Sequence, residues 1–253
     1  MNQTLPSTVS DAAADFGTEI AALAARYRRA NGPVMRLVGR IGGTLETQLA
    51  ALPEGVRRQM EALTAQALET SYGLAGRAPD LGRRGPVVAA LATGAAGGVG
   101  GLGTAMAELP VTVTLFLNTI RAVAEAEGFD PDDPQIRAEA LQVFAAGSPL
   151  AEDDGVNSSF IAARLTLTGS AMKNLIASIA PKLATVLGQK LVAQAVPVIG
   201  ALSGAALNVA FLSYYREIAA VRFRLLRLSQ LHGAERVQQE FRLAVTPPKI
   251  VRA

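Results

Sequence analysis

The 253-residue sequence contains no cysteine, no tryptophan and a single histidine, His232. Without thiols the chain can form neither disulfides nor iron–sulfur ligation, and one imidazole is too few for a structural zinc site. Aromatic residues make up only 5% of the sequence and charged residues only 18%. The basic residues therefore lack the interleaved aromatics that are typical of nucleic-acid-binding proteins. We expect no cofactor, no metal and no nucleic acid.

Hydrophobic residues, by contrast, make up half of the chain, which excludes a disordered protein and allows a large buried core. Apolar residues recur at helical spacing, and no segment alternates apolar and polar residues as a half-buried strand does. The sequence predicts an all-α fold, a single multi-helix bundle with two central apolar helices rich in glycine and alanine. Outside the two charge-free stretches described next, helices are predicted over 11–31, 34–52, 55–75, 110–127, 134–147, 158–180, 182–195, 216–230 and 233–243.

Two long stretches carry no charged residue, 85–107 and 191–215. A glycine inside a helix costs about 1 kcal/mol relative to alanine, so glycines in a helix need a packing reason. Small residues four apart let two helix backbones approach closely. We expect such contacts at Gly94, Gly97, Gly98, Gly101, Gly200 and Gly204. Each stretch is a buried core helix, part of a hairpin that inserts into a membrane, or a true span. The content of Ala, Gly, Thr and Ser favours the first interpretation.

The first stretch also contains a literal dinucleotide-binding pattern. Residues 98–103 have the spacing Gly-x-Gly-x-x-Gly and follow the apolar run 87–91. In a dinucleotide-binding fold this pattern joins a strand to a helix. The flanking segments favour helix, so we prefer close helix packing. A nucleotide-dependent oxidoreductase requires a strand at 87–91.

Charge is distributed unevenly along the chain, although the net charge is only +3. Segment 108–154 has ten acidic and two basic residues, whereas segment 155–234 has one acidic and eight basic residues. Either these segments face each other in the fold, or the basic residues meet anionic lipid headgroups. If the basic residues meet lipid headgroups, the predicted lipid or membrane contacts are Arg216, Arg222, Arg224 and Arg227. The helix that carries them has an apolar stripe on another side, at Ile218, Val221, Leu225 and Leu228.

Several polar residues lie within or beside the apolar stretches: Glu108, Asn118, Arg121, Lys190 and Asn208. A buried charge must be paired or hydrogen-bonded, so we expect Glu108 to pair with Lys190 or Arg121. Such a pair is most often a structural salt bridge, and the alternative is a polar site for a lipid headgroup or a substrate. The sequence identifies no catalytic residue.

Two groups of residues resemble the EcsC family of bacterial proteins. The first is Glu108-Leu109-Pro110 with the apolar helix that follows and Gly128-Phe129-Asp130, and the second is 196–201 with Gly204, Asn208 and the run 223–226. Glu108 stands where the family pattern has aspartate, which keeps a carboxylate. The resemblance covers residues 55–245. It implies a helical domain and, for some members, genetic linkage to an ABC exporter, but no established activity.

We therefore predict an N-terminal helical extension over 1–54, an EcsC-like helical domain over 55–245 and a flexible tail over 246–253. Residues 1–16 carry no basic residue, so we expect no secretory signal. The predicted function is that of a membrane- or lipid-associated accessory protein in the cytoplasm, peripheral at the inner membrane. Its expected partners are an anionic membrane surface or lipid and a membrane transporter. The alternative is an enzyme that acts on a lipid or other amphiphile, with Glu108 and Lys190 as a buried acid/base pair.

Overall fold

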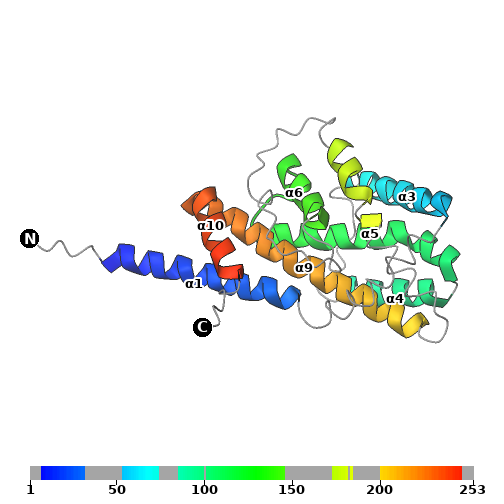
Figure 1. Cartoon of the computed structure of the whole chain (residues 1–253), viewed down its shortest axis with the longest axis horizontal. Coiled ribbons are helices and arrows are strands. Elements are labelled where there is room, and N and C mark those ends of the chain that lie inside the picture. The colour runs from blue at the N-terminus through cyan, green and yellow to red at the C-terminus, as the bar shows by residue number, and fades with distance from the viewer. Residues whose placement is uncertain are drawn as a thin grey trace, which may run out of the picture.

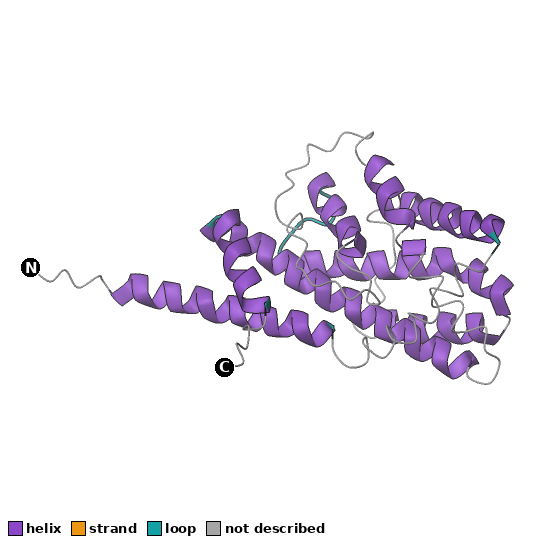
Figure 2. Ribbon diagram, viewed as in Figure 1, coloured by secondary structure: helices purple, strands orange, loops and turns teal. Residues whose placement is uncertain are grey.

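The computed structural model describes residues 7–31, 53–73, 85–99, 101–145, 173–181, 183–184 and 200–246. Every regular element in these ranges is an α-helix, which confirms the predicted all-α class (Figure 2). The helices are α1 (Ser7–Ala30), α3 (Glu54–Gly73), α4 (Gly85–Val99), α5 (Gly101–Ala126), α6 (Pro134–Ala145), α9 (Gly200–His232) and α10 (Ala234–Val245). Residues 173–181 are helical as well, whereas the helices predicted over 34–52 and in most of 182–195 lie outside the described residues.

The long helix α9 is the centre of the bundle (Figure 1). The consecutive helices α4 and α5 pack against each other and against α9, and α3 and α6 pack on α5. At the other end of the bundle, α1 and α10 pack on the C-terminal part of α9. The Gly/Ala-rich helix α4 thus lies directly against α9, which begins at Gly200, within the second charge-free stretch of the sequence. This arrangement confirms two central apolar helices.

Two separate groups of buried apolar side chains hold the helices together. The main core joins α3, α4, α5, α6 and α9, and its largest fully buried side chains include Phe116, Phe211, Tyr215 and Phe223. The second cluster joins α1, the C-terminal half of α9 and α10 through Phe16, Ile20, Leu23, Ala24, Val221, Leu225, Leu228, Val237 and Phe241. The apolar stripe expected on α9 is fully buried in these two groups.

Local sequence explains how α5 ends and α6 begins. Gly128 has a φ of +85°, a left-handed conformation that suits glycine, and the Phe129 N–H donates to the Ala124 carbonyl oxygen at 3.0 Å. The Phe129 ring then packs 5.8 Å from Phe223 of α9. At the start of α6, the Asp133 carboxylate accepts a hydrogen bond from the Gln135 N–H at 2.7 Å, which is helix N-capping.

Helix α5 begins earlier than the sequence predicts. The prediction of a helix over 110–127 is wrong at its start, because α5 runs from Gly101 to Ala126 with Pro110 inside it. Proline in a helix interior removes one hydrogen bond and costs about 3 kcal/mol. The flanking Leu109 and Val113 are 1% and 0% exposed, and burying each contributes roughly 1.5–3 kcal/mol. Packing therefore outweighs the local preference.

Candidate functional site

A buried polar cluster lies where α4, α5 and α9 meet. Asn208 of α9 is 0% exposed, and its side-chain amide donates to the Glu108 carboxylate at 2.9 Å. The same amide group donates to the Ala90 carbonyl oxygen and to Thr93 Oγ1, both at 3.1 Å. Thr112 Oγ1 donates to the same Glu108 oxygen at 3.1 Å. Asn208 therefore ties the three central helices together through their polar groups.

The structure separates two residues that the sequence suggested as a pair. Glu108 and Arg121 lie on the same helix, and 13 residues at 1.5 Å each place them about 20 Å apart. Arg121 instead forms an ion pair with Asp132, with its Nη2 atom 2.6 Å from Oδ1. Asn118 is half-buried on α5, and Lys190, the other expected partner of Glu108, lies outside the described residues.

Arg222 of α9 faces the protein interior rather than solvent. Its side chain is only 2% exposed, and it pairs with Glu139 of α6 and donates to Gln142. Burial raises the pKa of the Glu139 carboxyl, and Arg222 only partly offsets this effect. Burial likewise lowers the pKa of Arg222. A side chain in this position cannot meet a lipid headgroup, so the expected membrane contact is corrected for Arg222.

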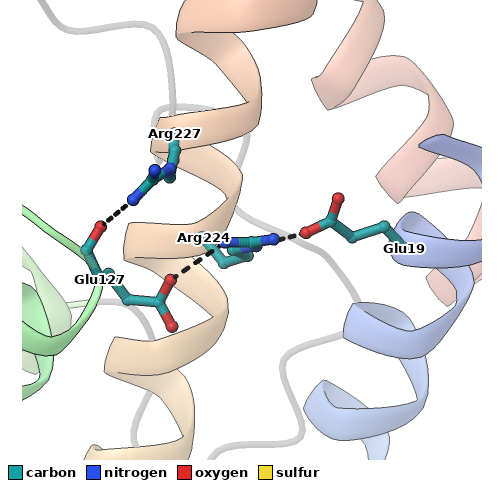
Figure 3. A network of polar contacts seen from close by, with 4 residues as sticks. All are labelled: Glu19, Glu127, Arg224 and Arg227. Atoms are coloured by element: carbon teal, nitrogen blue, oxygen red, sulfur yellow. Dashed lines mark hydrogen bonds and ion pairs between the residues drawn. The ribbon is translucent and has the colours of Figure 1, made fainter. Parts of the chain in front are cut away.

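Arg224 links α9 to two other parts of the fold (Figure 3). It forms an ion pair with Glu19 of α1, and its Nη1 atom lies 3.7 Å from Glu127, just after α5. The hydrogen bond with Glu19 raises the pKa of Arg224. One turn further along α9, Arg227 donates to the Glu127 carbonyl oxygen at 2.8 Å, where the C-terminal end of α5 favours a positive charge.

The four arginines of α9 thus lie in different environments. Arg222 is buried and Arg224 is half-buried, whereas Arg216 and Arg227 are exposed. The contacts of Arg222 with Glu139 and of Arg224 with Glu127 join the basic segment to the acidic one. They agree with the interpretation in which the acidic and basic segments face each other in the fold. No local pattern marks Glu19 or Glu139 as a partner, because both are distant in sequence from α9.

The glycines singled out in the sequence all lie in helices: Gly94, Gly97 and Gly98 in α4, Gly101 in α5, and Gly200 and Gly204 in α9. Close packing was expected at these glycines, and the helices that carry them, α4, α5 and α9, pack against one another. Residues 87–91 are helical, so the strand required for a dinucleotide site is absent there. This finding removes the oxidoreductase interpretation.

An exposed apolar side of α4 is a feature that the sequence does not predict. Val88 is 61% exposed, and Ala92, one turn later on the same helix, is exposed as well. On the adjacent helix α5, Val111 is 53% exposed. The only signal in the sequence is the absence of charge over 85–107, which does not tell which side of the helix faces outward.

Neither a metal site nor a membrane-crossing helix is found in the part of the chain that the structure describes. There, no three histidine, aspartate or glutamate side chains come together in a way that could hold a metal ion. Within the same residues, no helix combines the length and apolar character needed to cross a bilayer.

Comparison with known proteins gives one match. The model of the EcsC protein family matches residues 44–228, which is more than half of the chain. No curated protein and no solved structure matches the sequence. The matched segment contains α3, α4, α5, α6 and most of α9, whereas α1 and α10 lie outside it.

Proposed function

The chain belongs to the EcsC protein family, and we propose that it is a membrane-associated accessory protein that contacts the lipid surface through α4. The exposed side of α4 carries this proposal. Val88 is 61% exposed on a helix that lies in a stretch of 23 residues without a charge. An exposed apolar helix face gains free energy when it is buried at the boundary between headgroups and acyl chains.

The position of Val111 supports the same surface. Helix α4 ends at Val99, α5 begins at Gly101, and the two helices pack against each other. The amide of Asn208 contacts both Ala90 of α4 and Glu108 of α5, so Val88 and Val111, each within three residues of these positions, lie near the same level of the pair. The opposite side of α4 is buried against α9, where Ala90 is 0% exposed. One side of α4 is therefore available for a contact in the plane of the membrane surface.

The arginines of α9 play a smaller part in this proposal than the sequence suggested. Arg222 and Arg224 are engaged within the protein, and Arg216 and Arg227 remain exposed. We assign the contact to the cytoplasmic side of the inner membrane. The family resemblance suggests an ABC exporter as the membrane-protein partner there. The accessory role is preferred over an enzyme of lipids or amphiphiles, because Glu108 accepts structural hydrogen bonds from Asn208 and Thr112.

Co-sedimentation with lipid vesicles tests this proposal. The vesicles contain phosphatidylcholine alone or phosphatidylcholine with phosphatidylglycerol, at low and at high salt. Val88→Asp removes an apolar contact and adds an unpaired charge, so we expect it to weaken binding at least about tenfold, a change of 1.4 kcal/mol. The control is Leu231→Asp, the same charge change at a side chain that is 71% exposed at the far end of α9.

We expect Leu231→Asp to bind vesicles as the unchanged protein does. Equal binding by Val88→Asp and the unchanged protein would contradict a contact through α4. Failure of the unchanged protein to bind either vesicle type, at both salt concentrations, would refute the membrane function itself.

A further inference from the structure

We propose that α1 is a releasable cover, which docks on α9 and α10 in the free protein and leaves them at an anionic membrane surface. Arg224 and the apolar side chains beneath α1 then become lipid contacts. This inference rests on the proposed membrane function and adds a mechanism of regulation to it. Four properties of the α1 contact support it: its ion pairs, its separate apolar cluster, its position relative to the matched family segment, and the surface that it hides.

The polar contacts of α1 are of a kind that a charged surface weakens. Glu19 pairs with Arg224, and Arg26 Nε lies 2.5 Å from the Glu217 carboxylate. The side chains of both pairs are between 24% and 40% exposed. Partly exposed ion pairs are screened by salt and contribute little to stability. Anionic headgroups compete directly with Glu19 for Arg224.

The apolar contacts of α1 are separate from most of the main core. Phe16, Ile20, Leu23 and Ala24 belong to the second cluster. Only the last turn of α1 reaches the main core, through Ala30 and the partly buried Tyr27, which packs against both clusters. Most of α1 can therefore leave without opening the contacts among α4, α5 and α9. The segment matched by the family model begins at residue 44, so the main core is built almost entirely from helices of that segment, and among these α1 packs on α9.

Both surfaces of the opened contact fit a lipid boundary. On α9, the buried Val221 and Leu225 flank Arg224, the guanidinium group that Glu19 now neutralises (Figure 3). On α1, the apolar residues lie on one side, and Arg28 and Arg29 occupy the last turn. An apolar face with arginines beside it is the composition of helices that bind anionic membrane surfaces. A headgroup phosphate can take the place of the Glu19 carboxylate, because guanidinium groups bind both anions.

A pair of matched variants tests the role of Glu19. Glu19→Gln and Asp15→Asn each remove one negative charge from α1, but only Glu19 pairs with an arginine, and Asp15 is exposed with no ion pair among the described residues. We expect Glu19→Gln to bind phosphatidylglycerol-containing vesicles at least threefold more tightly than the unchanged protein. Asp15→Asn should differ from it by less than twofold. An equal increase for both variants would show a general charge effect and overturn the inference.

A covalent tether tests whether α1 must leave α9. Because the chain has no cysteine, Arg26→Cys with Glu217→Cys gives a unique thiol pair that a short bis-maleimide can join. The control is the same double variant with each thiol capped by N-ethylmaleimide. We expect the tethered protein to lose its preference for anionic over neutral vesicles and the capped protein to keep it.

The outcomes of the tether separate the two proposals. Equal anionic preference with and without the tether would overturn the release of α1 and leave the contact through α4 intact. Absence of vesicle binding by every variant, tethered or not, would overturn both proposals.

Discussion

Removing either partner of the buried ion pair between Arg222 and Glu139 is expected to destabilise the protein, but by unequal amounts. Arg222 is 2% exposed, and arginine keeps its charge at any pH at which a protein folds. In Glu139→Gln this charge loses its carboxylate partner and keeps neutral ones, among them the new amide and Gln142. Breaking a buried pair typically costs 3–5 kcal/mol, and we expect a loss of about 3 kcal/mol because those two partners remain.

The opposite variant, Arg222→Met, leaves a group that can become neutral. The pKa of Glu139 is already raised by burial, and Arg222 is the influence that opposes this rise. Without Arg222 the carboxyl takes up a proton more readily, so we expect a loss of roughly 1–2 kcal/mol near pH 5, smaller than the cost of an unpaired buried charge.

The loss in Arg222→Met should grow with pH. Between the unfolded pKa and the higher folded pKa of Glu139, the folded state binds more protons than the unfolded state. The free energy of unfolding therefore decreases as pH rises through this interval, by up to about 1.4 kcal/mol per pH unit. This contribution to stability is fully present below the unfolded pKa and is lost once the pH exceeds the folded pKa.

Urea unfolding followed by far-ultraviolet circular dichroism, from about pH 5 to pH 8, measures these differences. The control is Arg216→Met, which removes an exposed arginine from the same helix and should change stability by less than about 0.5 kcal/mol. Equal, pH-independent losses for Glu139→Gln and Arg222→Met would refute the reasoning, because they would show that the carboxyl does not respond to its buried surroundings.

Three further substitutions are expected to lower stability, and the same urea assay measures each of them. Asn208→Ala removes the amide group that donates to Ala90, Thr93 and the buried Glu108 carboxylate, so we expect a loss of about 3 kcal/mol; a loss under 1 kcal/mol would mean that Asn208 does not join the helices. Gly128→Ala places a side chain at a φ of +85°, with the new Cβ only 2.9 Å from Arg227 Nη1, and should cost about 2 kcal/mol. Gly233→Ala has nearly the same φ but open space around the Cβ, so it should cost only about 1 kcal/mol, and equal losses would mean that Arg227 adapts freely.

Most of the secondary structure follows from local patterns. The ranges predicted over 11–31, 55–75, 134–147 and 233–243 agree with α1, α3, α6 and α10 to within a few residues. Apolar spacing of 3.6 residues identified these helices and the buried side of α9, because that spacing is a property of the chain itself. The start of α5 was predicted wrongly because proline locally disfavours the interior of a helix, so Pro110 indicated a helix start. The packing that outweighs this local effect comes from other helices, which the local sequence does not show.

The candidate site could be predicted only in part. The sequence identified Glu108 and Asn208 as polar residues in apolar surroundings, and the structure joins them at 2.9 Å. It could not identify their partners: Arg121 was an equally reasonable choice for Glu108 until its distance along α5 and its contact with Asp132 were known. Hydrogen-bond partners from different helices depend on how the helices pack, which a helical pattern in one segment does not specify.

The amino-acid sequence alone determined the all-α class, the apolar side of α9 and the absence of charge in α4, because these depend on residue type and on spacing along one helix. Only the tertiary structure decided what each arginine of α9 does. Arg216 and Arg222 have the same charge and lie on the same helix, yet one is exposed and the other is buried beside Glu139. The difference arises because α6 covers one side of α9 and leaves another open, and α6 is brought there by contacts between residues far apart in the sequence.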